Sequence, residues 1–446
     1  MSGLFGTDGV RGIANTELSP DIAFKLGQAA VSFLGPTIVI GKDTRISGDM
    51  LEASLAAGIM SMGGSALLAG IVPTPAIALL TRELRADGGL VISASHNPPE
   101  YNGIKFFDAK GLKLPDEKEA NIEAFVVQGG ATSKDLAAGN NVGVIVPIEN
   151  AAEIYINFVV ESVASQKIDF SGMKIALDVG HGASAFTSAE ALSRLGAEVV
   201  CINDDFSGTD INVKCGSTYL EPIKDLARTI QADVGIAHDG DADRVILIDE
   251  AGGEIDGDVI EAVCALDLKS RGKLAKNTVV TTVMCNFGFM NAMRENEIEV
   301  LQTKVGDRSV LEAMQEHGLV IGGEQSGHLI LSEHNSTGDG LLVASQFLAA
   351  CKRLDKSISQ AAAIMHKYPQ SLINVEGVDK HALEDNEVVL RSIRSAEQKL
   401  ADQGRILVRA SGTEPLVRVM VEAQDEKLAL SLAQEIAQVI KQELSL

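Results

Sequence analysis

The chain has 446 residues, of which 46% are hydrophobic and 22% charged, and its formal net charge is -23 at pH 7. This acidic field repels duplex nucleic acid and anionic membranes. Aromatic residues make up only 4% and Trp is absent, so few faces exist on which single-stranded nucleic acid could stack. We therefore expect no nucleic acid and no membrane partner. Any bound phosphate needs a local cluster of Arg, Lys and backbone N–H groups.

The cysteines predict a reducing compartment. There are five, an odd number, and no Cys-x-x-Cys occurs, which argues against a disulfide framework or a structural zinc site: Cys201, Cys215, Cys264, Cys285 and Cys351. The N-terminal MSGLFGTDGVRG lacks a basic stretch followed by an apolar run, so it is not typical of a signal peptide. We expect a cytoplasmic protein.

Strand-like runs alternate with helical patterns through the first third of the chain. Residues 37–41, 65–70 and 89–93 predict strands, and helical patterns cover 50–63 and begin again near 74. Residues 53–81 carry no charge and mimic a membrane span, but Gly63-Gly64 and Pro73-Thr74-Pro75 break the run into shorter elements. The alternation predicts an α/β sandwich with a mixed or mostly parallel sheet.

The same pattern restarts at KIALDVGHG (174–182) and at TVVTTVMCN (278–286). The last part differs: two strands, 405–411 and 416–423, lie between helical stretches and predict an α+β unit. We expect three related α/β domains with mixed sheets and a smaller C-terminal α+β domain, arranged around a central cleft. The predicted domains are 1–149, 150–250, 251–368 and 369–446.

Ser95 lies in ISASHNPPEYNGIKFF, directly after a predicted buried strand. Pro98-Pro99 prevents a helix from continuing, so Ser95 is expected in a constrained loop at the carboxyl end of the strand, where open α/β sheets bind ligands. Neighbouring side chains usually diverge, so we expect His96 to point away from Ser95, which argues against a Ser–His hydrolase. Ser95 could accept a phosphoryl group, or it could simply begin a turn.

DGDADR (239–244) offers three aspartates at every second position. In an extended or looped backbone these carboxylates can converge on one hard cation, and oxygen ligands favour Mg²⁺. The spacing also fits the start of an EF-hand loop, but Arg244 occupies the position that needs Gly, and Val-Ile-Leu-Ile follows as a strand. The other interpretation is a solvated acidic turn.

Three further motifs are less specific. DVGHGASA (178–185) fits a dinucleotide fingerprint, although any tight strand-to-helix turn needs glycines. RASGTEPLVR (409–418) has small residues, hydroxyls and flanking arginines, which suit a phosphate, or it is a charged hairpin turn. GGEQSGH (322–328) offers donors and acceptors that could bind sugar hydroxyls, or it is a polar turn.

Together, SASHNP, DGDADR, GEQSGH and RASGTEP resemble the four motifs of the α-D-phosphohexomutase superfamily, in the same order. The resemblance extends from FGTDGVRG (5–12) to RASGTEP. FGTDGVRG and Gln325 make the chain similar to the bacterial phosphoglucosamine mutases within this superfamily. Tyr101, His238, Ala242 and Ser309 depart from the usual pattern, and at 242 the family commonly has Gly.

The resemblance implies a mutase reaction. A phosphorylated Ser95 would convert glucosamine 6-phosphate into glucosamine 1,6-bisphosphate, which also acts as the activator. The other phosphate would then return to Ser95, leaving glucosamine 1-phosphate for UDP-N-acetylglucosamine and peptidoglycan synthesis. One Mg²⁺ per site and a homodimer are further family expectations. Related hexose phosphates, a non-catalytic sugar-phosphate sensor and a nicotinamide oxidoreductase are the alternatives.

The implied site residues fall into three groups. Those expected to act in catalysis are Ser95, Arg11, Lys105 and His328. Those expected to hold the metal are Ser95, Asp239, Asp241 and Asp243. Those expected to bind substrate are Glu324 and Ser326 at the sugar, and Arg409, Ser411, Gly412, Thr413 and Arg418 at the phosphate that does not react.

Overall fold

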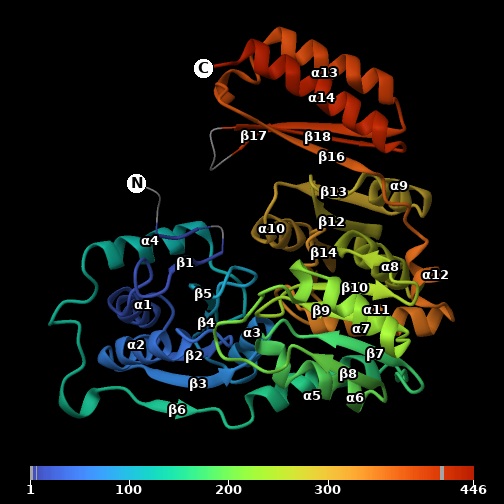
Figure 1. Cartoon of the computed structure of the whole chain (residues 1–446). Coiled ribbons are helices and arrows are strands. Elements are labelled where there is room, and N and C mark those ends of the chain that lie inside the picture. The colour runs from blue at the N-terminus through green and yellow to red at the C-terminus, as the bar shows by residue number, and fades with distance from the viewer. Residues whose placement is uncertain (1–3, 7, 412–415) are drawn as a thin grey trace. The chain divides into compact units, whose positions relative to one another are not determined.

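The computed structural model describes residues 4–6, 8–411 and 416–446. The chain divides into two compact units (Figure 1). The larger comprises residues 1–284 and 298–364, and the smaller comprises residues 285–297 and 365–446.

The first sheet of the larger unit has six strands in the order β1-β5-β4-β2-β3-β6. They are β1 (Val10–Ile13), β2 (Thr37–Lys42), β3 (Ser65–Ile71), β4 (Gly88–Ile92), β5 (Tyr101–Asp108) and β6 (Ile145–Pro147). The helices of this region are α1 (Pro20–Phe33), α2 (Gly48–Ser61), α3 (Thr74–Glu83) and α4 (Asp116–Val127). The sheet is mixed, because β5 runs antiparallel to β1 and β4 while β2 pairs in parallel with β3 and β4. Every residue of β4 is buried, as expected for a strand covered on both faces.

Two glycines allow α1 and α2 to pack closely. A Cβ at Gly27 would collide with the carbonyl oxygen of Leu55, and a Cβ at Gly58 would collide with that of Phe24. Both helices pack against the sheet, α1 against β2 and α2 against β2, β3 and β4.

β6 forms one edge of the first sheet. It pairs in parallel with β3 on one side. The carbonyl of Val144 accepts the N–H of Ala66, and the N–H of Ile148 donates to the carbonyl of Leu68. Because strand backbones alternate, the backbone groups of Ile145 and Pro147 face away from the sheet. Val144, Ile145 and Val146 are exposed.

The second sheet has five strands in the order β11-β10-β9-β7-β8, and the third has four in the order β13-β12-β14-β15. The strands of the second are β7 (Lys174–Asp178), β8 (Glu198–Ile202), β9 (Val234–His238), β10 (Val245–Asp249) and β11 (Glu254–Ile255). Those of the third are β12 (Thr278–Thr282), β13 (Glu299–Thr303), β14 (Ile321–Gly323) and β15 (Leu329–Leu331). The helices are α5 (Ala151–Ala164), α6 (Ser188–Arg194), α7 (Glu221–Ile230), α8 (Gly257–Ser270), α10 (Asp307–His317), α11 (Gly340–Leu354) and α12 (Ile358–Ala362).

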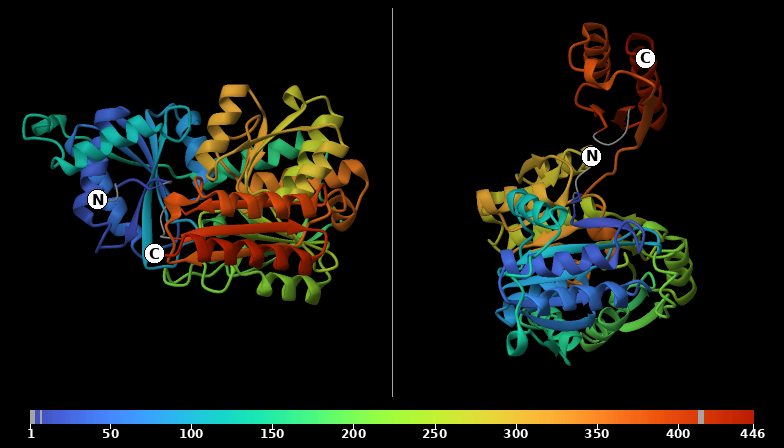
Figure 2. Two further views of the ribbon diagram at one scale, coloured as in Figure 1. Left: turned by 90° about the horizontal axis from the view of Figure 1, so that it is seen from above. Right: turned by 90° about the vertical axis from the view of Figure 1, so that its left-hand side faces the viewer.

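The smaller unit is built on an antiparallel sheet in the order β16-β18-β17. Its elements are β16 (Gln370–Glu376), β17 (Gly404–Ala410), β18 (Leu416–Ala423), α13 (Glu387–Leu400), α14 (Glu426–Glu443) and α9 (Phe287–Glu295). α13 and α14 lie side by side along one face of this sheet (Figures 1 and 2), and their apolar residues form its core. The buried carboxylate of Glu422 on β18 accepts the backbone N–H of Phe287, which ties the start of α9 to this unit.

These sheets confirm the predicted fold class of three α/β regions with mixed sheets and a smaller α+β region. The uncharged stretch 53–81 forms parts of α2, β3 and α3 as predicted. Among the described helices, none has the length and apolar character needed to cross a membrane.

Candidate active site

Ser95 follows the carboxyl end of β4, in the loop before β5. The side chain is buried, and its φ of 51° lies in the left-handed region, which is unusual for a residue other than Gly. Its hydroxyl donates to Asp239 Oδ2 at 2.6 Å. The loop therefore presents a nucleophilic oxygen directly to the aspartate motif of the second sheet.

The expectation that His96 points away from Ser95 is wrong. His96 Nδ1 lies 3.3 Å from Ser95 Oγ, because the left-handed turn at Ser95 breaks the usual alternation of side chains. Burial, together with the charges of Arg244 and Arg11, lowers the pKa of His96 to about 4. The ring is neutral near pH 7, and the shorter bond of Ser95 is to Asp239.

Asp239, Asp241 and Asp243 lie in the loop between β9 and β10 and are all buried. One carboxylate oxygen from each lies within 4.8 Å of the others. Burial, reinforced by the two neighbouring carboxylates, raises the pKa of Asp239 to about 8. The alternative of a solvated acidic turn is therefore excluded by burial.

The three carboxylates fit a hard divalent cation. Asp241 Oδ1 and Asp243 Oδ1 are buried and have no hydrogen-bond partner in the described part of the chain, so each has a lone pair to offer. Asp241 is fixed by α3, since Thr74 donates both its N–H and its hydroxyl to it, the hydroxyl to Oδ2 at 2.5 Å. The donor set is entirely oxygen, which favours Mg²⁺ over softer metals.

Ala242 has a φ of 54° and a fully buried methyl group. Gly adopts this left-handed conformation at no steric cost, whereas Ala pays for its Cβ. The departure leaves the aspartates converging, so the loop tolerates the left-handed Ala.

Lys105 on β5 supplies positive charge to the same cluster. Its ammonium lies 2.8 Å from Asp241, 3.0 Å from Asp243 and 3.0 Å from Asp8. Burial alone would lower the pKa of Lys105, but these carboxylates raise it well above its ordinary value. Arg11 also pairs with Asp8, at 2.6 Å, so Asp8 holds two of the expected catalytic cations.

His328 follows the loop between β14 and β15. Its Nδ1 lies 3.7 Å from Asp243, and its Nε2 lies 3.7 Å from Asp307 at the start of α10. Burial would lower the pKa of His328, but the nearby carboxylates of Asp243 and Asp307 raise it. Asp307 also pairs with Lys113, which in turn pairs with Asp8.

The sugar motif lies in the same loop as His328. Glu324 Oε1 accepts the backbone N–H of Gly306, and Ser326 is exposed. The side chain of Gln325 instead donates to Asp256, the N-cap residue of α8. In this loop Glu324 and Ser326 remain the candidates for sugar contacts, and Gln325 has a local structural partner.

The phosphate motif lies in the hairpin between β17 and β18 of the smaller unit. Arg409 and Arg418 are direct cross-strand partners, so their side chains share one face. Like charges in this arrangement repel, and an anion bound between them would remove that cost. Ser411 closes the hairpin through its N–H to Leu416, while the predicted Gly412 and Thr413 lie outside the described residues.

The glycines of DVGHGASA form the tight turn that was the alternative to a dinucleotide fingerprint, and the turn packs against the aspartate loop. A Cβ at Gly182 would collide with the backbone of Gly240 in the aspartate loop, and Ala183 donates its N–H to the carbonyl of Gly240. The buried Asp178 accepts the N–H groups of Gly180 and Gly216. This motif therefore supports the aspartate loop.

The other departures have local partners. His238 is buried with its ring between the Ser188 hydroxyl and the Arg244 carbonyl, and burial lowers its pKa to about 4. Tyr101 accepts a bond from Arg45 through its carbonyl, and Ser309 donates its N–H to the carbonyl of Gly306.

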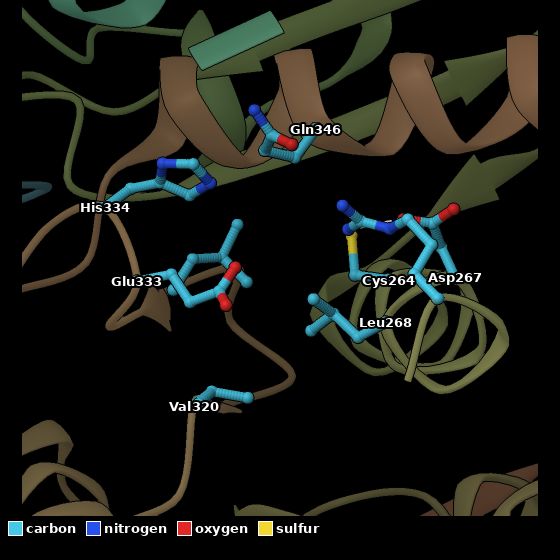
Figure 3. A pocket seen from close by; sticks show the side chains of 9 residues that line it. Cys264, Asp267, Leu268, Val320, Glu333, His334 and Gln346 are labelled. Atoms are coloured by element: carbon cyan, nitrogen blue, oxygen red, sulfur yellow. Dashed lines mark ion pairs between the residues drawn. The ribbon is translucent and has the colours of Figure 1, made fainter. Parts of the chain in front are cut away.

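A small pocket elsewhere in the larger unit contains none of the predicted site residues (Figure 3). Its lining includes Cys264, Asp267, Arg271, His334 and Gln346. Asp267 is already neutralised by Arg271 at 2.7 Å and Arg353 at 2.6 Å. The carboxylate is therefore occupied by structural ion pairs.

Several residues at the site are missed by the sequence interpretation: Asp8, Asp43, Arg45, Thr74, Lys113, Asn212 and Asp307. Asp8 lies in the motif FGTDGVRG, and Asp307 lies two residues before Ser309, so both were close to positions that the sequence itself singled out. Arg45 and Asn212 bind backbone carbonyls, which no side-chain pattern announces.

Family models match most of the chain. Those for phosphoglucomutase/phosphomannomutase alpha/beta/alpha domains I, II and III match residues 2–132, 153–253 and 256–368. The model for the C-terminal domain of the same family matches residues 372–439.

Curated relatives match the chain from end to end. The phosphoglucosamine mutase of Alkaliphilus oremlandii is 47% identical and covers 100% of both chains. That of Clostridium acetobutylicum is 48% identical and covers 99% of both.

Solved structures share the fold. A phosphoglucomutase/phosphomannomutase family protein from Burkholderia thailandensis has a TM-score of 0.82 at 22% identity, covering 99% of this chain and 98% of that one. The Aspergillus fumigatus N-acetylphosphoglucosamine mutase in complex with GlcNAc-6P and magnesium has a TM-score of 0.70 at 18% identity, covering 98% and 95%. The chain belongs to the phosphoglucomutase/phosphomannomutase family, and it is an enzyme of the mutase class.

Proposed function

We propose that this enzyme interconverts glucosamine 6-phosphate and glucosamine 1-phosphate through a phosphorylated Ser95 and glucosamine 1,6-bisphosphate. The observation that carries the proposal is the 2.6 Å bond from Ser95 Oγ to Asp239, which joins a nucleophile to a buried cation site. The full-length relatives called phosphoglucosamine mutase support this choice of substrate. The product would feed UDP-N-acetylglucosamine and peptidoglycan synthesis.

In the first step, the bond between Ser95 Oγ and phosphorus breaks while a substrate hydroxyl forms a new bond to phosphorus and gives its proton to a base of the site. In the second, the phosphoryl group at the other end of the bisphosphate moves to Ser95, and the released sugar oxygen regains a proton. Such transfers depend mainly on positioning and on neutralising charge.

Asp239, Asp241, Asp243 and the oxygens of Ser95 would hold one Mg²⁺. When bound, the ion supplies charge that neutralises the phosphoserine, which carries about -1.5 to -2 near neutral pH. Lys105 lies within 3.0 Å of two of these aspartates and adds positive charge on the same side.

Arg11, Lys105 and His328 are the candidates for proton transfer and charge stabilisation. His328 has an opposing carboxylate at each ring nitrogen, an arrangement that suits a group that alternates between charged and neutral forms. Glu324 and Ser326 would bind sugar hydroxyls. Arg409, Ser411, Gly412, Thr413 and Arg418 would hold the phosphate that is not reacting.

The test combines two measurements on freshly purified protein. Intact mass and peptide mapping should find phosphate on Ser95, and isomerisation should be fastest with glucosamine phosphates when compared with glucose and mannose phosphates. The family model, which is named for phosphoglucomutase and phosphomannomutase, favours related hexose phosphates as the second candidate. Faster turnover of those sugars would select it.

Ser95→Ala separates a mutase from a sugar-phosphate sensor. A mutase loses isomerisation in this variant while it still binds sugar phosphate. A parent protein that has no isomerase activity, and that binds sugar phosphate as tightly as Ser95→Ala does, would contradict the mutase proposal.

We further propose four domains, 1–149, 150–250, 251–368 and 369–446, and a cytoplasmic homodimer. Light scattering of the purified chain measures the oligomeric state. Expression of residues 369–446 alone, followed by circular dichroism, checks the last domain boundary.

A further inference from the structure

The side chain of Arg45 is fully buried beneath the Ser95 loop, and all five of its N–H groups donate hydrogen bonds. Nε donates to Asp43 at 3.0 Å. The other four donate to backbone carbonyls: those of Ser95, Asn97 and Pro98 in the loop after β4, and that of Tyr101 at the start of β5. A planar guanidinium can satisfy this set, whereas an ammonium has only three donors.

Asp43 holds the N–H side of the same loop. Its Oδ2 accepts the hydroxyl of Ser93 at 2.6 Å, and the Ser93 oxygen in turn accepts the N–H of Ser95 at 2.9 Å. Asp43 Oδ1 also accepts the N–H of Arg45 at 3.0 Å. The Asp43–Arg45 pair therefore grips both backbone groups of Ser95.

The loop needs such a grip because Ser95 has a φ of 51°. A left-handed residue other than Gly persists only where its surroundings fix it. The carbonyl of Ser95 also accepts Asn212 Nδ2 at 2.9 Å, from the loop before α7. This second donor ties the Ser95 loop to the region that carries the aspartates.

The residues beside Arg45 are anchored to the same region. The Thr44 hydroxyl donates to the carbonyl of His181 at 2.5 Å, and the Ile46 N–H donates to the carbonyl of Gly208 at 3.0 Å. Residues 43–46 thus connect the Ser95 loop with two loops of the second sheet.

We propose that Arg45 and Asp43 are positioning residues that hold Ser95 Oγ at the aspartate site for phosphoryl transfer, an inference that rests on the proposed function. Neither side chain needs to touch the substrate. Their effect is to keep the nucleophile within reach of the cation site in both steps, and a displacement of about 1 Å in such a site can cost about 100-fold in rate.

The experiment compares Arg45→Lys with the parent and with Arg353→Lys. Arg353 is a suitable control because it also pairs with a buried aspartate, Asp267, but contacts no residue of the site among those described. Two quantities are measured for each protein: hydrogen exchange of the amides of residues 94–102, and the rate at which Ser95 gains phosphate from glucose 1,6-bisphosphate, followed by intact mass.

Arg45→Lys is expected to exchange the amides of residues 94–102 at least tenfold faster, and to lower the rate of phosphate uptake and kcat by about 100-fold with KM changed less than threefold. Arg353→Lys should change none of these more than threefold. Arg45→Lys with exchange and rate within threefold of the parent would overturn the positioning role.

If the parent itself gains no phosphate on Ser95, the proposed function fails and the exchange measurement still decides the grip on the loop. Faster exchange in Arg45→Lys confined to residues 94–102 supports the proposal that Arg45 holds this loop, and unchanged exchange overturns it. Asn212→Ala adds an independent arm, because it removes the other donor to Ser95 while leaving the five bonds of Arg45 intact. It should produce the same changes in smaller measure.

Discussion

Lys105 neutralises two of the carboxylates that would hold the cation. Replacing Lys105 with Met tests whether its charge opposes the binding of Mg²⁺. The ammonium contacts Asp8, Asp241 and Asp243 within 3.0 Å; Lys105, Asp241 and Asp243 are almost fully buried, and Asp8 is partly exposed. Removing one partner of a buried ion pair usually costs about 3–5 kcal/mol, because the remaining charges lose their compensation. Metal-free Lys105→Met should lose about that much unfolding free energy.

Magnesium should restore much of this loss. An ammonium about 4 Å from a cation opposes binding by about 4 kcal/mol per unit charge at an effective dielectric of about 20. We therefore expect the variant to bind Mg²⁺ at least tenfold more tightly than the parent. At a free concentration of about 100 times Kd, a bound ligand adds about 2.7 kcal/mol to the unfolding free energy.

The assay is urea unfolding of each protein in EDTA and in a series of Mg²⁺ concentrations. Lys113→Met is the matched control, because the Lys113 side chain is nearly as buried as that of Lys105 and pairs with Asp8 and Asp307, but with none of the three aspartates of the 239–243 loop. It should be destabilised in EDTA, yet gain from Mg²⁺ only what the parent gains. Equal Mg²⁺ increments in the parent and in Lys105→Met would refute the reasoning.

Three further outcomes are expected. Arg418→Ala should raise KM about 10–100-fold with kcat nearly unchanged, because a charge-assisted bond to phosphate contributes about 1.5–3 kcal/mol. Steady-state kinetics measure both constants, and an unchanged KM would contradict the proposal that Arg418 binds the phosphate of the substrate. Chelation should reduce turnover to below about 1%, and excess Mg²⁺ should restore it; activity that persists after dialysis against EDTA would argue against a metal role. Burial and the bond to Asp339 raise the pKa of Tyr155 well above its ordinary value, so the folded chain keeps a proton that the unfolded chain loses above about pH 10. Unfolding free energy should then fall by up to about 1.4 kcal/mol per pH unit above that value, and Tyr155→Phe should flatten this slope in urea titrations.

The strands of the α/β regions were predictable because burial on both faces leaves a plain apolar signature. β4 and β7 are short strands with apolar centres, and Ser or Gly follows each within two residues; β12 is a β-branched run of Thr and Val. The aspartate motif was predictable for the same reason, since its three carboxylates directly follow the buried strand β9. Both the strands and the aspartate motif could thus be predicted from residues that are adjacent in the sequence.

The remaining site residues depend on contacts between distant segments. Lys113 bridges Asp8 and Asp307, which are 105 and 194 residues away, and no local pattern specifies that meeting. The prediction that His96 points away from Ser95 was wrong because their close approach follows from one backbone torsion, that of Ser95. Arg45 was missed because its partners are mostly backbone carbonyls, which leave no pattern in the sequence. The residues that follow it predict only the start of α2.

The edge strand β6 has a consequence for the behaviour of concentrated protein. A row of exposed valine and isoleucine with open backbone groups is a template on which another chain can add a strand and begin to aggregate. Pro147 has no N–H to offer on that outward side, so within β6 only Ile145 can donate there. The proline at 147 therefore limits the pairing of a further strand with this exposed edge of the sheet.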